Sequence, residues 1–273
     1  INNRNLIAMN DQIMKGKKGL IMGVANDHSL AWGIANKLHQ NGADLAFTYQ
    51  GETFKKRVEP LANSINCINN LIDCDVLNES ELVDAFDFIK NKWGQIDFIV
   101  HSIAHSDKNE LNGKYINTSR ENFLKTLEIS CFSLTNISKI FEPIINDNGS
   151  ILTLTYGGSE KVIPNYNVMG VAKAALESSV RYLAVDLGAR GIRINALSAG
   201  MMRTLAGSAV KNSRSMFKFA EKHKPLKDIP LNLDDIGSSG LYLTSDLSRG
   251  VTGEIHYVDQ GYNIIGMPKT EDL

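Results

Sequence analysis

The chain has 273 residues, of which 43% are hydrophobic and 22% are charged, and its formal net charge is −1. This length fits one large α/β domain or two small ones, and the composition is typical of a globular protein with a sizeable core. The near-zero charge argues against nucleic acid as the main partner. Because no apolar run approaches 18 residues, we expect no membrane span.

The cysteines and histidines argue against a disulfide framework and a metal centre. Cys67, Cys74 and Cys131 form an odd set without a CxxC pair, which is typical of a reducing cytosol, so we expect a cytoplasmic protein. His101 and His105 are the only close pair of histidines, and they fall at the end of an expected strand rather than on a helix. We therefore expect no metal.

In chain order, apolar runs alternate with helical patterns. A first strand is expected to end at Gly23, a helix with Gly42 as its stop follows, and 43–50 predicts a second strand. Further strands are expected at 67–75, 95–104, 150–156, 191–200 and 253–261. Further helices are expected at 52–63, 79–92, 120–141, 165–187 and 233–245.

This alternation predicts the fold class. Near-continuous apolar strands separated by helices indicate an α/β protein with a doubly wound parallel sheet and helices on both faces. We expect a single Rossmann-type domain over residues 15–267, with ligands beyond the carboxyl ends of the strands. Residues 1–14 lack the apolar core of a signal peptide and are expected to be a flexible segment or an expression remnant; 268–273 are expected to be a C-terminal tail.

The turn after the first strand carries a modified dinucleotide signature. Gly23 suits the tight turn, and Gly33 allows close helix packing. Ser29 and Leu30 fall where the next helix begins, so their backbone N–H groups are expected to face a pyrophosphate. By itself this turn is a weak signal, since glycine-containing turns after strands are common.

Later strand ends point to the same ligand. Gln50 ends the second strand, at the position where dinucleotide-binding folds contact the adenosine ribose. The nearby Glu52 disfavours a 2′-phosphate on that ribose, so NADH is favoured over NADPH. Asp75 and Val76 end the third strand and could pair with the adenine edge, while Ile103 follows the fourth strand beneath the nicotinamide ribose.

A tyrosine phenol and a lysine ammonium later in the chain are the candidate catalytic groups. Tyr166 and Lys173 are seven residues apart on an expected helix, which would place both on one face about 10.5 Å apart along the axis. A phenol can donate a proton or a hydrogen bond, and a cation can bind cofactor hydroxyls. Tyr156 lies ten residues earlier, at the end of the fifth strand; a core aromatic remains the alternative for it.

Over roughly residues 15–267 the sequence resembles the NADH-dependent enoyl-[acyl carrier protein] reductases of type II fatty acid synthesis, within the short-chain dehydrogenase/reductase superfamily. The most specific match is IPNYNVMGVAKAALE, with the seven-residue Tyr–Lys spacing and Tyr156 near the position of the usual Ser. Family members have SAGPIRTLA where this chain has SAGMMRTLA, so Met201 stands in place of a proline. This replacement removes a rigid φ constraint and should loosen the loop after the sixth expected strand. After the fourth expected strand, where the family has Phe-Ala-Pro, residues 105–107 of this chain are His-Ser-Asp.

The resemblance implies roles for individual residues. Tyr166 would stabilise the anionic thioester oxygen, Tyr156 would bind the thioester or shape its pocket, and Ser106 would approach the substrate through its backbone. Lys173 would hold the nicotinamide ribose. The cofactor contacts implied are Gly23, Ser29, Leu30, Gln50, Asp75, Val76, Ile103, Lys173, Met202, Arg203, Thr204, Leu205 and Ala206.

The partners implied are an enoyl thioester on acyl carrier protein and further copies of the chain in a homotetramer. Residues 204–224 would form a substrate lid, with Lys211 and Arg214 docking the acidic carrier; an ordinary amphipathic surface helix is the alternative. Two other functions stay open: a ketone or alcohol oxidoreductase of the same superfamily, and a dinucleotide-binding regulator without catalysis.

Overall fold

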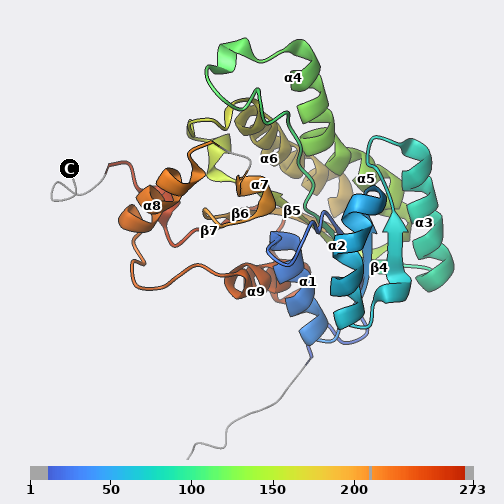
Figure 1. The fold of residues 1–273 in the computed structure, drawn as a ribbon. Helices are drawn as coiled ribbons and strands as arrows, with labels where there is room; N and C mark the ends of the chain where they lie inside the picture. Colours follow the sequence, from blue (N-terminus) through green and yellow to red (C-terminus); the bar gives the residue numbers. More distant parts are fainter. Residues whose placement is uncertain (1–11, 209–210, 268–273) are drawn as a thin grey trace, which may run out of the picture.

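The computed structural model describes residues 12–208 and 211–267 (Figure 1). Within these residues seven strands form one parallel sheet in the order β3-β2-β1-β4-β5-β6-β7. The strands are β1 (Lys18–Met22), β2 (Asp44–Tyr49), β3 (Leu71–Asp73), β4 (Ile96–His101), β5 (Ile145–Thr155), β6 (Arg193–Ala199) and β7 (Ile255–Val258). The predicted doubly wound α/β fold is confirmed.

Helices cover both faces of the sheet. One face carries α1 (Leu30–Gln40), α2 (Gly51–Ser64) and α9 (Leu233–Thr244), and the other carries α3 (Glu79–Trp93), α5 (Ser133–Phe141) and α6 (Asn167–Gly188). The helix α4 (Arg120–Leu127) leads into α5 and contacts α6. Two helices, α7 (Leu205–Ser208) and α8 (Ser213–His223), follow β6, and α8 lies toward the outside of the molecule (Figure 1).

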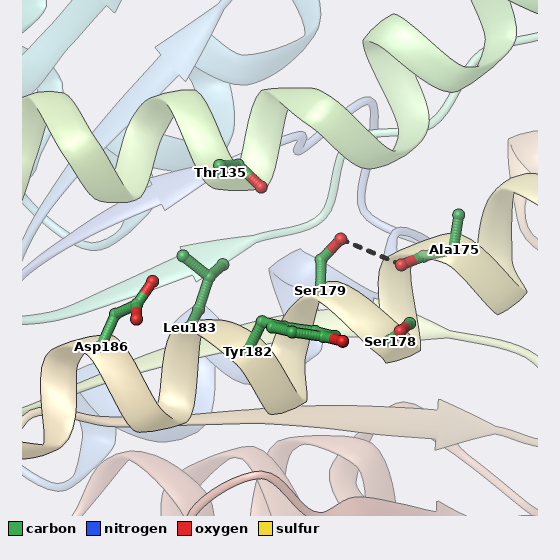
Figure 2. A pocket seen from close by; sticks show the side chains of 7 residues that line it. All are labelled: Thr135, Ala175, Ser178, Ser179, Tyr182, Leu183 and Asp186. Carbon is green, nitrogen blue, oxygen red and sulfur yellow. Dashed lines mark hydrogen bonds between the residues drawn. The ribbon is translucent and has the colours of Figure 1, made fainter.

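The helices α5 and α6 enclose an open hollow on the outer side of the molecule. It has a volume of about 400 Å³, and Figure 2 shows Thr135 of α5 facing a row of α6 side chains across it. Its lining residues are Thr135, Ala175, Ser178, Ser179, Tyr182, Leu183 and Asp186. None of the residues predicted to bind cofactor or substrate lines this hollow.

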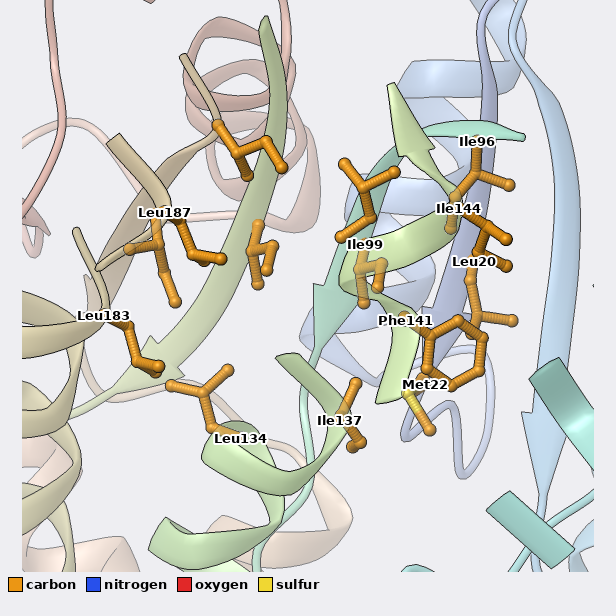
Figure 3. Close-up of a cluster of buried hydrophobic side chains, with 14 of the residues drawn as sticks. Leu20, Met22, Ile96, Ile99, Leu134, Ile137, Phe141, Ile144, Leu183 and Leu187 are labelled. Atoms are coloured by element: carbon orange, nitrogen blue, oxygen red, sulfur yellow. The ribbon is translucent and has the colours of Figure 1, made fainter. Parts of the chain in front are cut away.

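Alternation along the strands divides the core between the two faces. Leu20 and Met22 of β1 face the cluster under α3, α5 and α6, where Phe141 and Ile137 pack (Figure 3). Ile21 faces the opposite cluster with Ile34 of α1. Since both faces of β1 are buried, this strand reads as a continuous apolar run.

The packing of α1 against α9 depends on Gly33. A Cβ atom at this position would lie 2.8 Å from the carbonyl oxygen of Leu233, closer than carbon and oxygen atoms can pack. The expectation that Gly33 permits close helix packing is confirmed, with α9 as the partner.

Two predicted elements were wrong in extent. The expected helix at 120–141 is interrupted by a π-helical segment, Glu128–Phe132, where the Ser133 hydroxyl donates to the Ile129 carbonyl at 2.7 Å. Hydroxyl groups that bind the helix backbone compete with regular helical bonding. The expected strand at 67–75 is shortened to β3, because a 3-10 turn at Ile68–Asn70 occupies its first half.

Residues 1–11 and 268–273 of the expected terminal segments lie outside the described residues, as do residues 209–210 of the expected lid. In the described part of the chain, no helix has the length and apolar character needed to cross a membrane. Nor does this part contain a group of three or more His, Cys, Asp or Glu side chains placed to hold a metal ion.

Candidate active site

Gly23 lies where the strand order reverses, between the carboxyl ends of β1 and β4. Its φ is +94°, and a Cβ atom there would lie 2.0 Å from the carbonyl oxygen of Ser102. The Ser102 N–H in turn donates to the Met22 carbonyl at 2.9 Å. Only glycine lets the two strand ends approach in this way. The crevice beyond such a reversal is the usual ligand position of doubly wound folds.

The turn after Gly23 is held by Ser29, the N-cap residue of α1. Its hydroxyl oxygen accepts from the N–H groups of Ala25 and Asn26, both at 3.0 Å. The Ser29 N–H donates to the Asn26 carbonyl at 3.1 Å. This differs from our expectation that the Ser29 N–H faces a pyrophosphate, because the turn already uses that donor. Leu30 is the first residue of α1 and is partly buried against the core.

The predicted adenosine positions lie in direct contact. Gln50 follows β2, and its side-chain Nε2 donates to the Asp75 carboxylate at 2.7 Å. Val76 packs beside them against the core cluster that also contains α3. On the exposed surface of α2, Lys55 pairs with Glu52 at 3.3 Å.

Two charged side chains of α6 reach the end of β5. Lys173 is only 6% exposed, and its ammonium donates to the Leu154 carbonyl at 2.8 Å. One turn later, Glu177 accepts from the Thr155 hydroxyl at 2.5 Å. Burial lowers the pKa of the Lys173 ammonium to about 8, an effect opposed by the charges of Cys131 and Glu177. At neutral pH, Lys173 therefore carries a charge in a protected position.

Tyr156 and Tyr166 form an edge-to-face pair beside this strand end. Their ring centroids are 5.2 Å apart and the rings are inclined by 78°. Burial raises the pKa of the Tyr156 phenol to about 12 and, together with the neighbouring Tyr156 and Glu177, raises that of Tyr166 further. Both phenols are protonated at neutral pH, so each can donate a hydrogen bond.

Tyr166 precedes α6 as its N-cap residue, so the helix begins at Asn167 rather than at the expected residue 165. The neighbouring Asn165 and Asn167 both have positive φ angles, of 60° and 38°. The phenol ring lies against Gly158, where a Cβ atom would stand 2.5 Å from the ring atom Cδ1. Gly158 was missed in the sequence, although the glycine-rich turn after the strand is its signal.

At the sequence level His101 was weighed only as a possible metal ligand, and its structural role was missed. His101 is fully buried; its Nδ1 lies 2.9 Å from the Thr153 hydroxyl and its Nε2 lies 2.8 Å from the Ser133 hydroxyl. Burial, and then the charge of Lys173, lower the pKa of His101 to about 3. This neutral imidazole ties β4 to β5 and α5 directly before Ser102 and Ile103. A polar residue inside an apolar strand is the signal that could have found it.

The remaining predicted contacts follow β4 and β6. Ile103 packs against the core, and Met202 packs against the opposite cluster. Arg203 places its guanidinium 5.3 Å from the centre of the Phe217 ring. The Thr204 hydroxyl accepts from the Gly207 N–H at 3.0 Å.

Leu205 begins α7 and is exposed, while the side chain of Ala206 lies outside the described residues. Ser106 contacts α4 through its hydroxyl, which donates to the Asn122 carbonyl oxygen Oδ1 at 3.3 Å.

Comparison with known proteins identifies the family. The model of the family described as "Enoyl-(Acyl carrier protein) reductase" matches residues 23–263. The chain belongs to this reductase family. It is 58% identical to "Enoyl-[acyl-carrier-protein] reductase [NADH] 2" of Rhizobium meliloti (strain 1021), over 96% of this chain and 97% of that relative.

Solved structures of the reductase family share the fold. The crystal structure of FabI from Candidatus Liberibacter asiaticus has a TM-score of 0.91 and 56% identity, over 94% of this chain and 99% of the other. The reductase of Anaplasma phagocytophilum, crystallised in complex with NAD, has a TM-score of 0.89 and 50% identity, over 95% and 96% of the two chains.

Proposed function

We propose that this chain reduces the carbon–carbon double bond of a trans-2-enoyl thioester carried by acyl carrier protein, using NADH, in the last step of the fatty acid elongation cycle. The observation that carries the proposal is the pair of protonated phenols, Tyr156 and Tyr166, beside the buried ammonium of Lys173. All three lie beyond the carboxyl end of β5, on the side of the sheet where doubly wound folds bind ligands.

The described residues fit a dinucleotide. Gly23 forms the tight turn at the carboxyl ends of β1 and β4, and Gln50 with Asp75 offers amide and carboxylate groups to the adenosine end. The carboxylates of Asp73 and Asp75 lie near Gln50 and disfavour a 2′-phosphate, in line with NADH. The remaining proposed contacts are Ser29 through its turn, Leu30, Val76, Ile103, Met202, Arg203, Thr204, Leu205 and Ala206.

NADH, when bound, supplies the hydride that the β-carbon of the enoyl group receives. Negative charge then develops on the thioester oxygen, and Tyr166 donates a hydrogen bond to that oxygen. Donors of this kind are each worth about 3–4 kcal/mol of barrier. Lys173 binds the ribose hydroxyls and keeps the local field positive, and Tyr156 binds the thioester or shapes its pocket. A proton delivered to the α-carbon by solvent or through a relay completes the saturated product.

The test is the oxidation of NADH by crotonyl-coenzyme A, followed at 340 nm, with the Tyr166→Phe variant beside the parent. We expect the parent to turn over and the variant to lose about 100-fold or more in kcat while still binding NADH. Turnover of ketones but not of enoyl thioesters would instead support a ketone reductase. NADH binding without any turnover would support a regulator.

We further propose that the region 204–224 is the substrate lid and that its basic residues dock acyl carrier protein. The Asn165 amide donates to the Lys211 carbonyl at 3.1 Å, which brings this region beside the loop that carries Tyr166. Arg214 lies in the first turn of α8, and Phe219 of the same helix is exposed. Charge reversal at Lys211 and Arg214 should raise KM for the carrier-linked substrate but not for the coenzyme A analogue; equal effects on both would contradict docking.

We also propose that α5 and α6 pack against further copies of the chain in a homotetramer. An apolar stripe on α6 is exposed in the single chain: Tyr182 is 75% exposed and Val185 is 80% exposed, and Phe132 on the neighbouring segment is 56% exposed. The hollow in Figure 2 lies along this stripe. Sedimentation of the parent should give the mass of a tetramer, and Val185→Asp should give smaller species.

A further inference from the structure

The loop that follows β4 is held by a row of polar side chains on the α4 side. Asn122, Thr126 and Ser130 occur at four-residue spacing, so they share one face of the helical segment. All three are buried, with exposed fractions of 6%, 0% and 0%. Buried polar groups at helical spacing require partners, and here most of the partners belong to residues 105–107. Within the row, the Thr126 hydroxyl also lies 3.2 Å from the Asn122 Oδ1 atom, while the Asn122 Nδ2 atom has no partner among the described residues.

Each member of the row makes a specific bond to this loop. The Asn122 Oδ1 atom accepts from the Asp107 N–H at 3.0 Å and from the Ser106 hydroxyl at 3.3 Å. The Thr126 hydroxyl donates to the Ser106 hydroxyl at 3.0 Å. The Ser130 hydroxyl both accepts from the His105 N–H, at 2.9 Å, and donates to the His105 carbonyl, at 3.1 Å.

The far end of the same loop is tied to the residue beside Tyr166. The Asn167 amide donates to the Leu111 carbonyl at 3.1 Å, and the Leu111 side chain is buried against Val168 and Met169 of α6. The loop therefore spans from the strand end at His101 to the start of the helix behind the phenol. Its position is determined at one end by α4 and at the other by α6.

These bonds account for the departure of residues 105–107 from the Phe-Ala-Pro of the family pattern. A proline fixes φ through its ring and has no N–H to donate. This chain has Asp107 instead, and its free N–H is bound by Asn122. A hydrogen bond from the Asp107 N–H to Asn122 thus takes the place of the proline ring as the constraint on the backbone at this position.

We propose that Asn122 is a positioning residue that, with Thr126 and Ser130, holds the loop at 105–107 in the geometry that receives the acyl thioester. The role rests on the proposed function, since Ser106 is the loop residue expected to approach the substrate. Asn122 acts through the loop backbone. Its loss should therefore weaken thioester binding far more than NADH binding or the chemical step.

The first experiment compares Asn122→Ala with Ser138→Ala. Ser138 is a matched control because its hydroxyl, on α5, is equally buried and has no partner among the described residues. We expect Asn122→Ala to raise KM for crotonyl-coenzyme A about tenfold, with kcat and the Kd of NADH changed less than threefold. Ser138→Ala should change none of these. A lower Tm with unchanged KM would reduce Asn122 to a structural residue and overturn the proposal.

The second experiment is a double-mutant cycle with Asp107→Pro. Proline removes the N–H that Asn122 binds and supplies its own φ constraint, so the effects of the two substitutions on KM should be smaller together than their sum. Additive effects would overturn the proposal. If Asn122→Ala does not fold, Thr126→Val, which removes the hydroxyl bonded to Ser106, replaces it in the first experiment with the same expected direction. Absence of turnover in the parent would refute the proposed function instead, so the two failures are distinguishable.

Discussion

Replacing Gly158 by alanine should displace the Tyr166 ring without removing any reacting group. The added Cβ atom would lie 2.5 Å from Cδ1 and 2.7 Å from Cε1 of that ring. Carbon atoms in contact are separated by about 3.5 Å or more, so the ring has to move by about 1 Å. A displacement of about 1 Å at a catalytic group can reduce the rate by about 100-fold.

The neighbouring Gly157 supplies the matched control. A Cβ atom there has no heavy atom within 4 Å, so Gly157→Ala should leave the site unchanged. Steady-state kinetics with crotonyl-coenzyme A and fluorescence titration of NADH would be measured for both variants. We expect kcat to fall about 100-fold in Gly158→Ala alone, with NADH affinity retained, and overpacking to cost about 1–3 kcal/mol of stability.

Two results would refute this reasoning. If Gly158→Ala keeps kcat within threefold of the parent, then the position of the Tyr166 ring does not limit catalysis. If Gly157→Ala loses as much activity as Gly158→Ala, then the glycine-rich turn acts through its flexibility rather than through the space it leaves for the ring. Thermal melts of both variants separate these outcomes from unfolding.

Three further predictions concern charge and backbone. The pKa of Lys173 is lowered to about 8, so NADH affinity should fall as pH rises through 8. The free energy of unfolding should rise between pH 8 and 10.5, because the unfolded chain binds more protons there. An NADH affinity that stays constant from pH 7 to 9.5 would contradict this prediction. Because the pKa of His101 is lowered to about 3, the free energy of unfolding should fall by at most about 5 kcal/mol as pH decreases from 6.5 toward 3. Denaturant titrations should show a smaller decrease of the unfolding free energy over this pH range in His101→Gln. Met201→Pro should raise Tm by about 1–4 °C and lower the Kd of NADH; a lower Tm would show that the loop does not accept the proline φ.

The sequence predicts the elements that depend on interactions between residues close together in the chain. The strand ending at Gly23 is buried on both faces, so its apolar run and the glycine that follows are visible without a structure. The positions of Gln50 and Asp75 at neighbouring strand ends also follow from sequence, because parallel strands bring their carboxyl ends to one edge; their hydrogen bond was not predicted.

The sequence does not predict contacts that tertiary packing decides. The bond from Asp107 to Asn122 joins a loop to a helix, and that from His101 to Ser133 joins a strand to a helix 32 residues later. The start of α6 was predicted two residues too early for a related reason. Helical spacing assumes a regular helix, whereas Asn165 and Asn167 have positive φ angles and Tyr166 between them is the N-cap residue.

The helix α6 connects the proposed assembly to the proposed chemistry. Lys173 and Glu177 project from its inner side to the end of β5, while Tyr182 and Val185 project outward into solvent. Covering the outer side by another subunit would bury apolar surface and resist bending of the helix. A shift of the helix axis would move the Lys173 ammonium relative to the Leu154 carbonyl that it binds. On this reasoning the proposed subunit contact would help to keep the Lys173 ammonium in position, although the residues of that contact lie on the opposite side of the helix.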